Sequence, residues 1–361
     1  MYVADQFADQ RFEIFAAPID GSSAPVRVNS PLAAGGDVHF RPEISADGEW
    51  IVYTADQDVP DRFELYAAPV DGSAAPVKLN GPLAVDTNVA YLGFDQPQFQ
   101  ITADVRRVLF MGDPEREEQF ELYSVPLDRS SPQVRLSGPM VAGGDVRYAS
   151  NSQKLFLLTP DQTRVLYLAD QDVDETVELY VAPVDGSAPS MRLNGPLVPG
   201  GDVLPTYSGR AFLQFTPDSE RVLYLADQDA DEVYELYAVP LDGSRAAKKL
   251  NGLLAPGGDV QPGFQITPDG SRVVYGADQR LDGVFELFEA SLDDSRAPRR
   301  LNSPPIPAGD VFVGPLFEIT PDGSRVLFVA DLDSDDVLEL HESLLSRPAS
   351  RRAPGEPGKT R

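Results

Sequence analysis

The sequence predicts an all-β fold, a β-propeller of four-stranded antiparallel blades, and two observations lead to it. A Glu followed by an aliphatic residue and then by an aromatic residue or His recurs seven times, at intervals of 51 to 57 residues. The anchor residues are Glu13, Glu64, Glu121, Glu178, Glu235, Glu286 and Glu339. Each repeat also holds apolar runs of strand length separated by turn residues, four of them between residues 212 and 260. Sheets repeated with this period bury both faces only by stacking on their neighbours, as propeller blades do.

The four strands of a blade are read in order. The first strand ends in a Thr-Pro-Asp-Gly-like turn and is readable six times, at residues 42–48, 99–105, 155–161, 212–218, 264–270 and 317–323. The second, such as Arg-Val-Leu-Tyr-Leu-Ala-Asp at 164–170, is continuously apolar, which indicates burial on both faces and a middle place in the blade. The third carries the Glu anchor. The fourth, an apolar-basic-Leu-Asn pattern, is clear six times, with residues 349–353 a weak seventh candidate.

Seven second strands and seven third strands predict seven blades, with the terminal blades incomplete. The first blade lacks its innermost strand and the last lacks a clear outer one, so six blades with spare terminal strands is the alternative. Residues 2–6 match residues 224–228, inside a repeat, so we expect either a fragment of a longer protein or an incomplete first blade. We predict one domain over residues 1–346 and a disordered, basic, Pro-rich tail over 347–361.

Two turn-and-strand segments carry a family resemblance. TPDGSRVVYGADQ at 267–279 and TPDGSRVLFVAD at 320–331 resemble the WD40-like PD40 repeat, over roughly residues 1–345. That repeat is the blade of TolB-like propellers and of the propeller domains of prolyl-oligopeptidase relatives. The resemblance implies the fold and, through TolB, a protein partner in an extracytoplasmic setting, periplasmic or secreted, although no signal peptide is visible. It leaves the function open, because propellers of this kind serve many tasks.

The composition narrows the class of partner. The chain has 57 acidic and 30 basic residues, a formal charge of −27, and no cysteine. Such a field repels nucleic acid and anionic membranes and attracts cations and basic proteins. The lack of cysteine excludes disulfides and thiolate chemistry. We therefore expect a monomer that binds a protein or peptide, with no nucleic acid and no membrane insertion.

Catalytic motifs are missing from the sequence. There are two histidines, His39 and His341, and His341 replaces the aromatic residue of a third strand, where we expect it to pack. The sequence has neither a Gly-x-Ser-x-Gly nucleophile elbow nor a phosphate-binding loop. TolB-like propellers that act as sugar lyases use several histidines on a metal, which this chain cannot supply. The sequence predicts a protein that is not an enzyme.

An acidic pattern precedes the anchor Glu in three repeats. Alternating carboxylates there resemble the spacing of calcium-binding loops, so calcium is a possible cofactor. The glycine that gives such loops their sharp turn is missing. The alternative is a solvated hairpin loop in which the Glu pairs with a fourth-strand cation such as Arg192 or Lys249. The candidate metal ligands are Asp170, Asp172, Asp174 and Glu178, then Asp227, Asp229, Asp231 and Glu235, then Asp331, Asp333 and Asp335.

Three long connections between blades, at residues 90–98, 147–154 and 204–211, hold the candidate partner-binding residues. They lie on the same face as the acidic loops, opposite the tight Gly/Asp turns, from which little binding is expected. Tyr and Arg are the residue types that anchor interfaces. The alternative is that these segments extend the innermost strand or pack over the channel mouth. The candidates are Tyr91, Phe94, Arg147, Tyr148, Tyr207 and Arg210.

These patterns together favour a non-catalytic propeller scaffold that binds a protein or peptide on the acidic loop face. Two alternatives stay open. One is a calcium-stabilised structural module. The other is the substrate-gating propeller domain of a hydrolase whose catalytic domain is absent from this chain.

Overall fold

The computed structural model describes residues 1–39, 41–89, 98–147, 156–204, 206–207, 210–211, 213–293, 295–305, 309–311, 317–334 and 337–347, with the backbone alone at 206–207 and 210–211. The described chain consists of strands and turns, and it holds no helix capable of crossing a membrane. It divides into two compact units, residues 1–194 and 195–361, each a series of small antiparallel sheets. The single domain expected over residues 1–346 stays a prediction.

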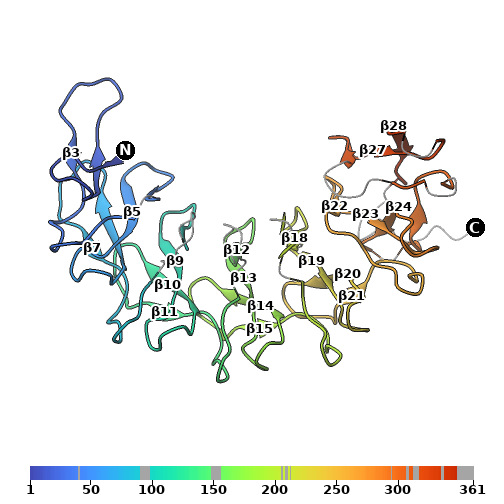
Figure 1. The fold of residues 1–361 in the computed structure, drawn as a ribbon, viewed down its shortest axis with the longest axis horizontal. Coiled ribbons are helices and arrows are strands. Elements are labelled where there is room, and N and C mark those ends of the chain that lie inside the picture. The colour runs from blue at the N-terminus through green and yellow to red at the C-terminus, as the bar shows by residue number, and fades with distance from the viewer. Residues whose placement is uncertain are drawn as a thin grey trace, which may run out of the picture. The chain divides into compact units, whose positions relative to one another are not determined.

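The first unit holds four sheets, in which each strand pairs with the next along the chain (Figure 1). The first sheet has three strands, β1 (Tyr2–Ala4), β2 (Glu13–Ala16) and β3 (Val26–Arg27). The second comprises β4 (Glu43–Ile44), β5 (Trp50–Ala55), β6 (Glu64–Pro69) and β7 (Val77–Lys78). The third comprises β8 (Phe99–Ile101), β9 (Arg107–Gly112), β10 (Glu121–Pro126) and β11 (Val134–Arg135). The fourth comprises β12 (Phe156–Leu158), β13 (Arg164–Ala169), β14 (Glu178–Pro183) and β15 (Met191–Arg192).

The second unit holds three such sheets and a short hairpin, β16 (Thr206–Tyr207) with β17 (Arg210–Ala211). Blade five is β18 (Leu213–Phe215), β19 (Arg221–Ala226), β20 (Glu235–Pro240) and β21 (Lys248–Lys249). Blade six is β22 (Gln265–Ile266), β23 (Arg272–Ala277), β24 (Glu286–Ser291) and β25 (Arg299–Arg300). Blade seven has three strands, β26 (Phe317–Ile319), β27 (Arg325–Ala330) and β28 (Glu339–Leu344).

The predicted propeller of seven blades is therefore confirmed, as are its two incomplete terminal blades. Blade one begins with a second strand, and blade seven ends with a third strand in the described chain. Residues 349–353, the weak candidate for a last fourth strand, lie outside the described residues.

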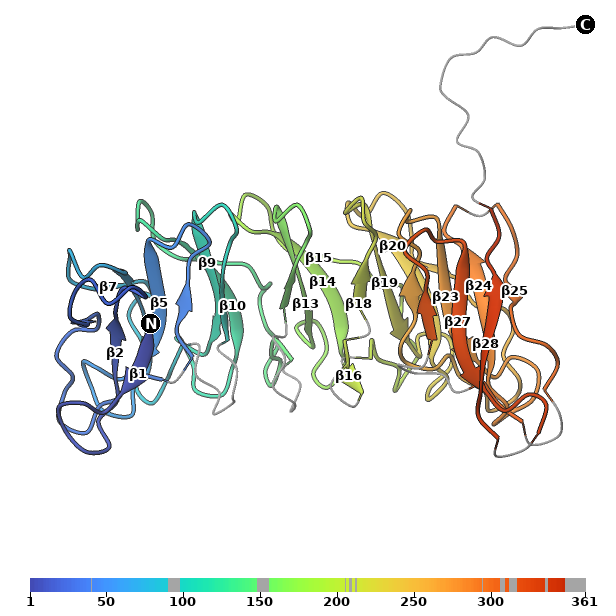
Figure 2. The same cartoon turned by 90° about the horizontal axis from the view of Figure 1, so that it is seen from above.

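The core lies between consecutive sheets, which stack within each unit (Figure 2). The second strand is buried on both faces, as its continuous apolar run predicts: Val165, Leu166 and Tyr167 are 0% exposed. An aromatic pair stacks across the second and third strands, with 5.4 Å between the ring centroids of Tyr167 and Tyr180. In blade seven His341 occupies this place, 5.5 Å from the Phe328 ring, which confirms its packing role.

Candidate binding site between blades three and four

The first aspartate of the acidic loop in blade four, Asp170, joins blades three and four. Asp170 is fully buried, and its Oδ1 accepts the backbone N–H of Asp145 at 2.6 Å. Its Oδ2 accepts the N–H of Glu175 at 3.0 Å and pairs with the Arg147 guanidinium. Asp145, in the connection, accepts in turn the N–H of Phe120 in blade three at 2.7 Å. The Asp170 carboxylate therefore satisfies one backbone N–H of the connection and one of its own loop.

The equivalent aspartates of the second unit accept backbone N–H groups in the same way. Asp227 Oδ1 accepts the N–H of Asp202 at 2.5 Å, and its Oδ2 accepts the N–H of Glu232 at 3.0 Å. Asp331 Oδ1 accepts the N–H of Asp310, also at 2.5 Å.

The anchor glutamates pair with cations of the fourth strand. Glu178 Oε1 lies 2.7 Å from Arg192 Nη1, and Glu178 Oε2 accepts the hydroxyl of Tyr180 at 2.7 Å. Lys249 Nζ lies 2.6 Å from Glu235 and 2.7 Å from Asp229. The ion pair between the anchor Glu and a fourth-strand cation, expected as the alternative to a calcium site, is thus present in both units.

The remaining acidic candidates differ in their surroundings. Asp172 lies 3.9 Å from Arg192. Asp174 and Asp231 lie against glycines of the connections, where a Cβ would come within 2.7–2.8 Å of a carboxylate oxygen. Asp335 lies outside the described residues, and Asp333 is exposed. Within the described chain no three carboxylate or histidine side chains gather as a cation site. Calcium binding stays a prediction, which thermal unfolding with calcium and with chelator at matched ionic strength tests.

The long connections are only partly described. Tyr91, Phe94 and Tyr148 lie outside the described residues. Tyr207 and Arg210 are backbone partners in the β16–β17 hairpin. Arg147, the remaining candidate, directs its guanidinium to buried Asp170 and so has a structural partner. Partner binding by these residues stays a prediction.

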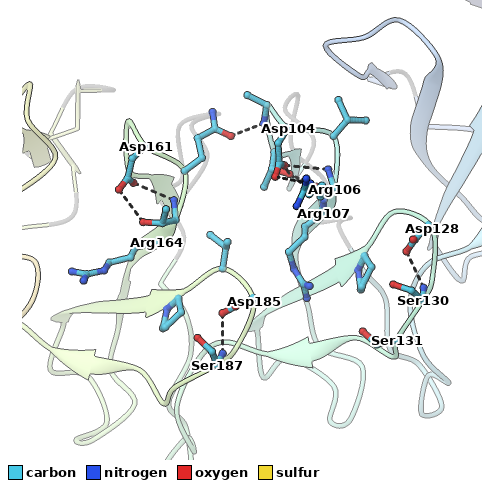
Figure 3. Close-up of a pocket in the computed structure, with 18 of the residues that line it drawn as sticks. Asp104, Arg106, Arg107, Asp128, Ser130, Ser131, Asp161, Arg164, Asp185 and Ser187 are labelled. Atoms are coloured by element: carbon cyan, nitrogen blue, oxygen red, sulfur yellow. Dashed lines mark hydrogen bonds and ion pairs between the residues drawn. The ribbon is translucent and has the colours of Figure 1, made fainter.

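A hollow of about 1260 Å³ lies on the opposite face, among the tight turns of blades three and four. Figure 3 shows turns from each blade around it, with Asp104 and Asp161 on one pair and Asp128 and Asp185 on the other. The first pair joins the first and second strands, and the second pair joins the third and fourth. The charged residues of its lining are Asp104, Arg106, Arg107, Asp128, Asp161, Arg164 and Asp185.

Arg107, the first residue of β9, is a half-buried cation of this hollow. Its Nε donates to the hydroxyl of Ser124 in β10 at 2.7 Å, and Ser124 is fully buried. Its two terminal nitrogens make no hydrogen bond or ion pair with the described residues. Burial lowers the pKa of Arg107, and Asp185 and Asp104 oppose that effect. Because the ordinary pKa of arginine lies far above neutrality, the guanidinium stays charged.

The aspartates of the hollow are held by their own turns. The Thr102 hydroxyl donates to Asp104 Oδ1 at 2.6 Å and lowers the pKa of that carboxyl. Hydrogen bonds from Ser130 and from Ser187 lower the pKa values of Asp128 and Asp185. These groups are therefore ionised at neutral pH, and part of their accepting capacity is used within the turns.

Two residues at the edge of the hollow have left-handed backbone conformations. Val105 has φ 59° and Gln162 has φ 57°, at the turn position where blade two has Gly48. Gln162 Oε1 also accepts the N–H of Ala103 across the two blades at 2.5 Å. A β-branched residue with positive φ is uncommon, and such strain concentrates at functional sites.

This site was not predicted from the sequence, because tight Gly/Asp turns are poor binding elements in general. One signal was available. Ser124 stands where the third strands of the other four-stranded blades have Ala67, Val181, Ala238 and Glu289. A buried hydroxyl at that position needs a polar partner, which Arg107 supplies.

Comparisons with known proteins place the chain by fold. No protein-family model and no curated protein matches the sequence. Solved structures do match. Dipeptidyl peptidase 4 from Porphyromonas gingivalis is 12% identical with a TM-score of 0.50, over 85% of this chain and 42% of that one. At this identity the likeness carries the fold alone.

Two further structures span most of both chains. A candidate TolB protein from Agrobacterium tumefaciens is 13% identical, with a TM-score of 0.34 over 93% of this chain and 91% of that one. Oligogalacturonate lyase from Vibrio parahaemolyticus is 12% identical, with a TM-score of 0.38 over 95% and 97%. The order of the strands in the blades shows the β-propeller fold that the repeat motif predicted.

Proposed function

We propose that this protein is a non-catalytic propeller scaffold that binds an extended segment of a protein or peptide in the hollow between blades three and four. The supporting observation is Arg107, whose terminal nitrogens face a hollow of about 1260 Å³ without an acceptor in the described chain. In blade five the equivalent Arg221 donates to the carbonyl of Leu292 in the next blade at 2.5 Å. A ligand carbonyl or carboxylate takes the corresponding place at Arg107.

A peptide suits the chemistry of the lining better than a small apolar ligand. The hollow exceeds the roughly 300–1,000 Å³ of small-molecule sites, and hydroxyls, carboxylates and guanidinium groups dominate its surface. An extended peptide offers alternating donors and acceptors along its length, and an acidic side chain or C-terminal carboxylate can pair with arginine in bidentate geometry.

The lining does not favour acid–base catalysis. Its turn aspartates have lowered pKa values, which leaves them ionised and poor proton donors near neutrality. No histidine lies among the residues that line the hollow. The extracytoplasmic setting and the monomeric state expected from the sequence belong to the same proposal.

An array of immobilised extended peptides, half of them with acidic residues, tests the proposal with the full chain in solution. We expect retention of peptides that carry a single acidic residue among neutral or basic ones, because pairing of that residue with Arg107 then does not act against the net charge of −27. Their affinity should fall as salt rises. Arg107→Ala should weaken binding at least tenfold. Arg245→Ala, an exposed arginine on a tight turn of blade five, is the matched control and should leave binding unchanged. Equal binding by both variants, or no retained peptide, would overturn the proposal.

A further inference from the structure

The third strand of blade seven, β28, has an edge that every other blade covers. In blades one to six the third strand pairs with a fourth strand of two residues. In blade seven β28 pairs with β27 alone in the described chain. The fourth strands of these six blades therefore show which groups a strand needs in order to pair with the open edge of β28.

The fourth strand satisfies three groups of the third strand, as blade six illustrates. The N–H of Leu301 donates to the carbonyl of Leu287 at 2.7 Å. The N–H of Leu287 donates in turn to Asn302 Oδ1 at 2.9 Å. Arg300 Nη1 lies 2.5 Å from Glu286 Oε1. The basic residue, the leucine and the asparagine of the fourth strand thus each bind one group of the third strand.

This arrangement recurs with constant spacing. The cation follows the anchor Glu by 14 residues in each of the six blades, as Arg27, Lys78, Arg135, Arg192, Lys249 and Arg300. The side chain that accepts the third-strand N–H follows two residues later in every blade. It is an asparagine at Asn29, Asn80, Asn194, Asn251 and Asn302, and Ser137 in blade three.

In blade seven the same three groups are without these partners. Glu339 is exposed, whereas the other six anchor glutamates are 1–7% exposed. Leu340 is 72% exposed, against 0% for its counterparts such as Leu287. In the described chain the Leu340 N–H and carbonyl form no hydrogen bond of the kind that Leu287 makes. An edge with unpaired groups and exposed leucine is a template for another strand.

The sequence that follows β28 does not fit the template. The 14-residue spacing places Ala353, Pro354 and Gly355 where the cation, the leucine and the asparagine would stand. Alanine carries no charge, proline has no N–H for the Leu340 carbonyl, and glycine has no side-chain acceptor. Residues 353–355 therefore supply neither the cation, nor the backbone N–H, nor the side-chain acceptor that this edge needs.

We propose that the edge of β28 binds an extended segment of a protein partner with the pattern apolar-Arg/Lys-Leu-Asn, which adds as the fourth strand of blade seven. Main-chain hydrogen bonds to Leu340 would supply affinity, and pairing of the cation with Glu339 would supply specificity. The chain's net charge of −27 also favours a basic segment. This site lies in the second unit and is independent of the hollow beside Arg107.

A labelled peptide with the sequence of residues 187–197, SAPSMRLNGPL, is the probe, since it copies the fourth strand of blade four. Fluorescence anisotropy of the peptide titrated with the full chain should saturate. Glu339→Arg should weaken binding at least tenfold, and a peptide with Arg192→Glu should regain binding to that variant. Glu318→Arg, an exposed glutamate on β26, makes the same charge change on another strand and should bind like the original chain.

Three results would overturn the proposal. They are absence of saturation, equal binding by the Glu339→Arg and Glu318→Arg variants, and sedimentation showing a dimer that the peptide does not dissociate. The last would assign the edge to a second copy of the chain. Arg107→Ala should bind this peptide normally, so failure at β28 and failure at the hollow are distinguishable.

Discussion

The junction between blades three and four and the junction between blades five and six are built on the same frame. In each, an aspartate at the end of a second strand accepts a backbone N–H from the connection. An aspartate of the connection then accepts an N–H from the preceding blade. The pairs are Asp170 with Asp145 at the first junction and Asp278 with Asp259 at the second.

The two junctions differ at the opposite end of the sheets. Arg221 of blade five reaches the carbonyl of Leu292 in blade six, whereas Arg107 of blade three bonds Ser124 within its own sheet. Blade five has Ala238 at the position of Ser124 and so offers its arginine no such acceptor. One buried hydroxyl therefore accompanies the difference between a bridged junction and a hollow, and two junctions with the same frame can differ in their other polar contacts.

Removal of the shared aspartate should have the largest effect. Asp170→Ala and Asp278→Ala each leave two backbone N–H groups without their acceptor, and Asp170→Ala also removes the partner of Arg147. We expect a loss of about 2–4 kcal/mol in the free energy of unfolding for each. Urea unfolding at neutral pH measures it. A loss below about 1 kcal/mol for one of them would show that the two frames are not equivalent.

Removal of the arginine that begins the second strand should affect the stability of the two junctions differently. Each substitution removes a hydrogen bond donated by a guanidinium, but Arg221→Ala also breaks a contact between two blades. We expect a cost of about 2–3 kcal/mol for Arg221→Ala and about 1.5 kcal/mol for Arg107→Ala. The same urea titrations compare them. An equal or reversed order would contradict the distinction between a bridged and an open junction.

The anchor glutamates offer a smaller test. In blade four Tyr180 donates its hydroxyl to Glu178, and burial together with Glu178 raises the pKa of Tyr180, so the phenol stays protonated. Blade six has Phe288 instead, and the buried Oε2 of Glu286 has no hydrogen-bond partner. Phe288→Tyr should therefore stabilise the protein by about 1 kcal/mol. Tyr180→Phe is the converse control and should destabilise it by a similar amount, as thermal unfolding would show.

The connection aspartates should give the smallest effect, and one that depends on pH. Burial raises the pKa values of Asp145 and Asp259, so their ionised forms disfavour folding above those pKa values. Asparagine accepts the same N–H, as Asn88 does from Phe63 at 2.8 Å. Asp145→Asn should thus stabilise the protein at neutral pH by less than about 1 kcal/mol, because water screens a half-exposed carboxylate.

The sign of that pH dependence is the critical observation. The gain from Asp145→Asn should fade as the pH falls through the raised pKa of Asp145, where the original side chain becomes neutral. Stability curves from pH 3 to 7, at about 0.15 M salt, measure it. A gain that persists or grows in acid would contradict a burial-raised pKa.

The sequence by itself determined the blades. Its period, its apolar second strands and its turn residues are local signals that act within about 50 residues, and they predicted all seven blades and the places of the missing strands. The pairing of Glu178 with Arg192 was also within reach, because adjacent strands bring a fixed spacing into contact.

Only the tertiary structure decided how the polar groups are used between blades. No local pattern shows that Asp170 serves the connection or that Arg221 bridges to the carbonyl of Leu292. These outcomes depend on which acceptor lies nearest after the sheets have stacked. Near-identical repeats therefore acquire different chemistry through single buried contacts, which composition and periodicity do not encode.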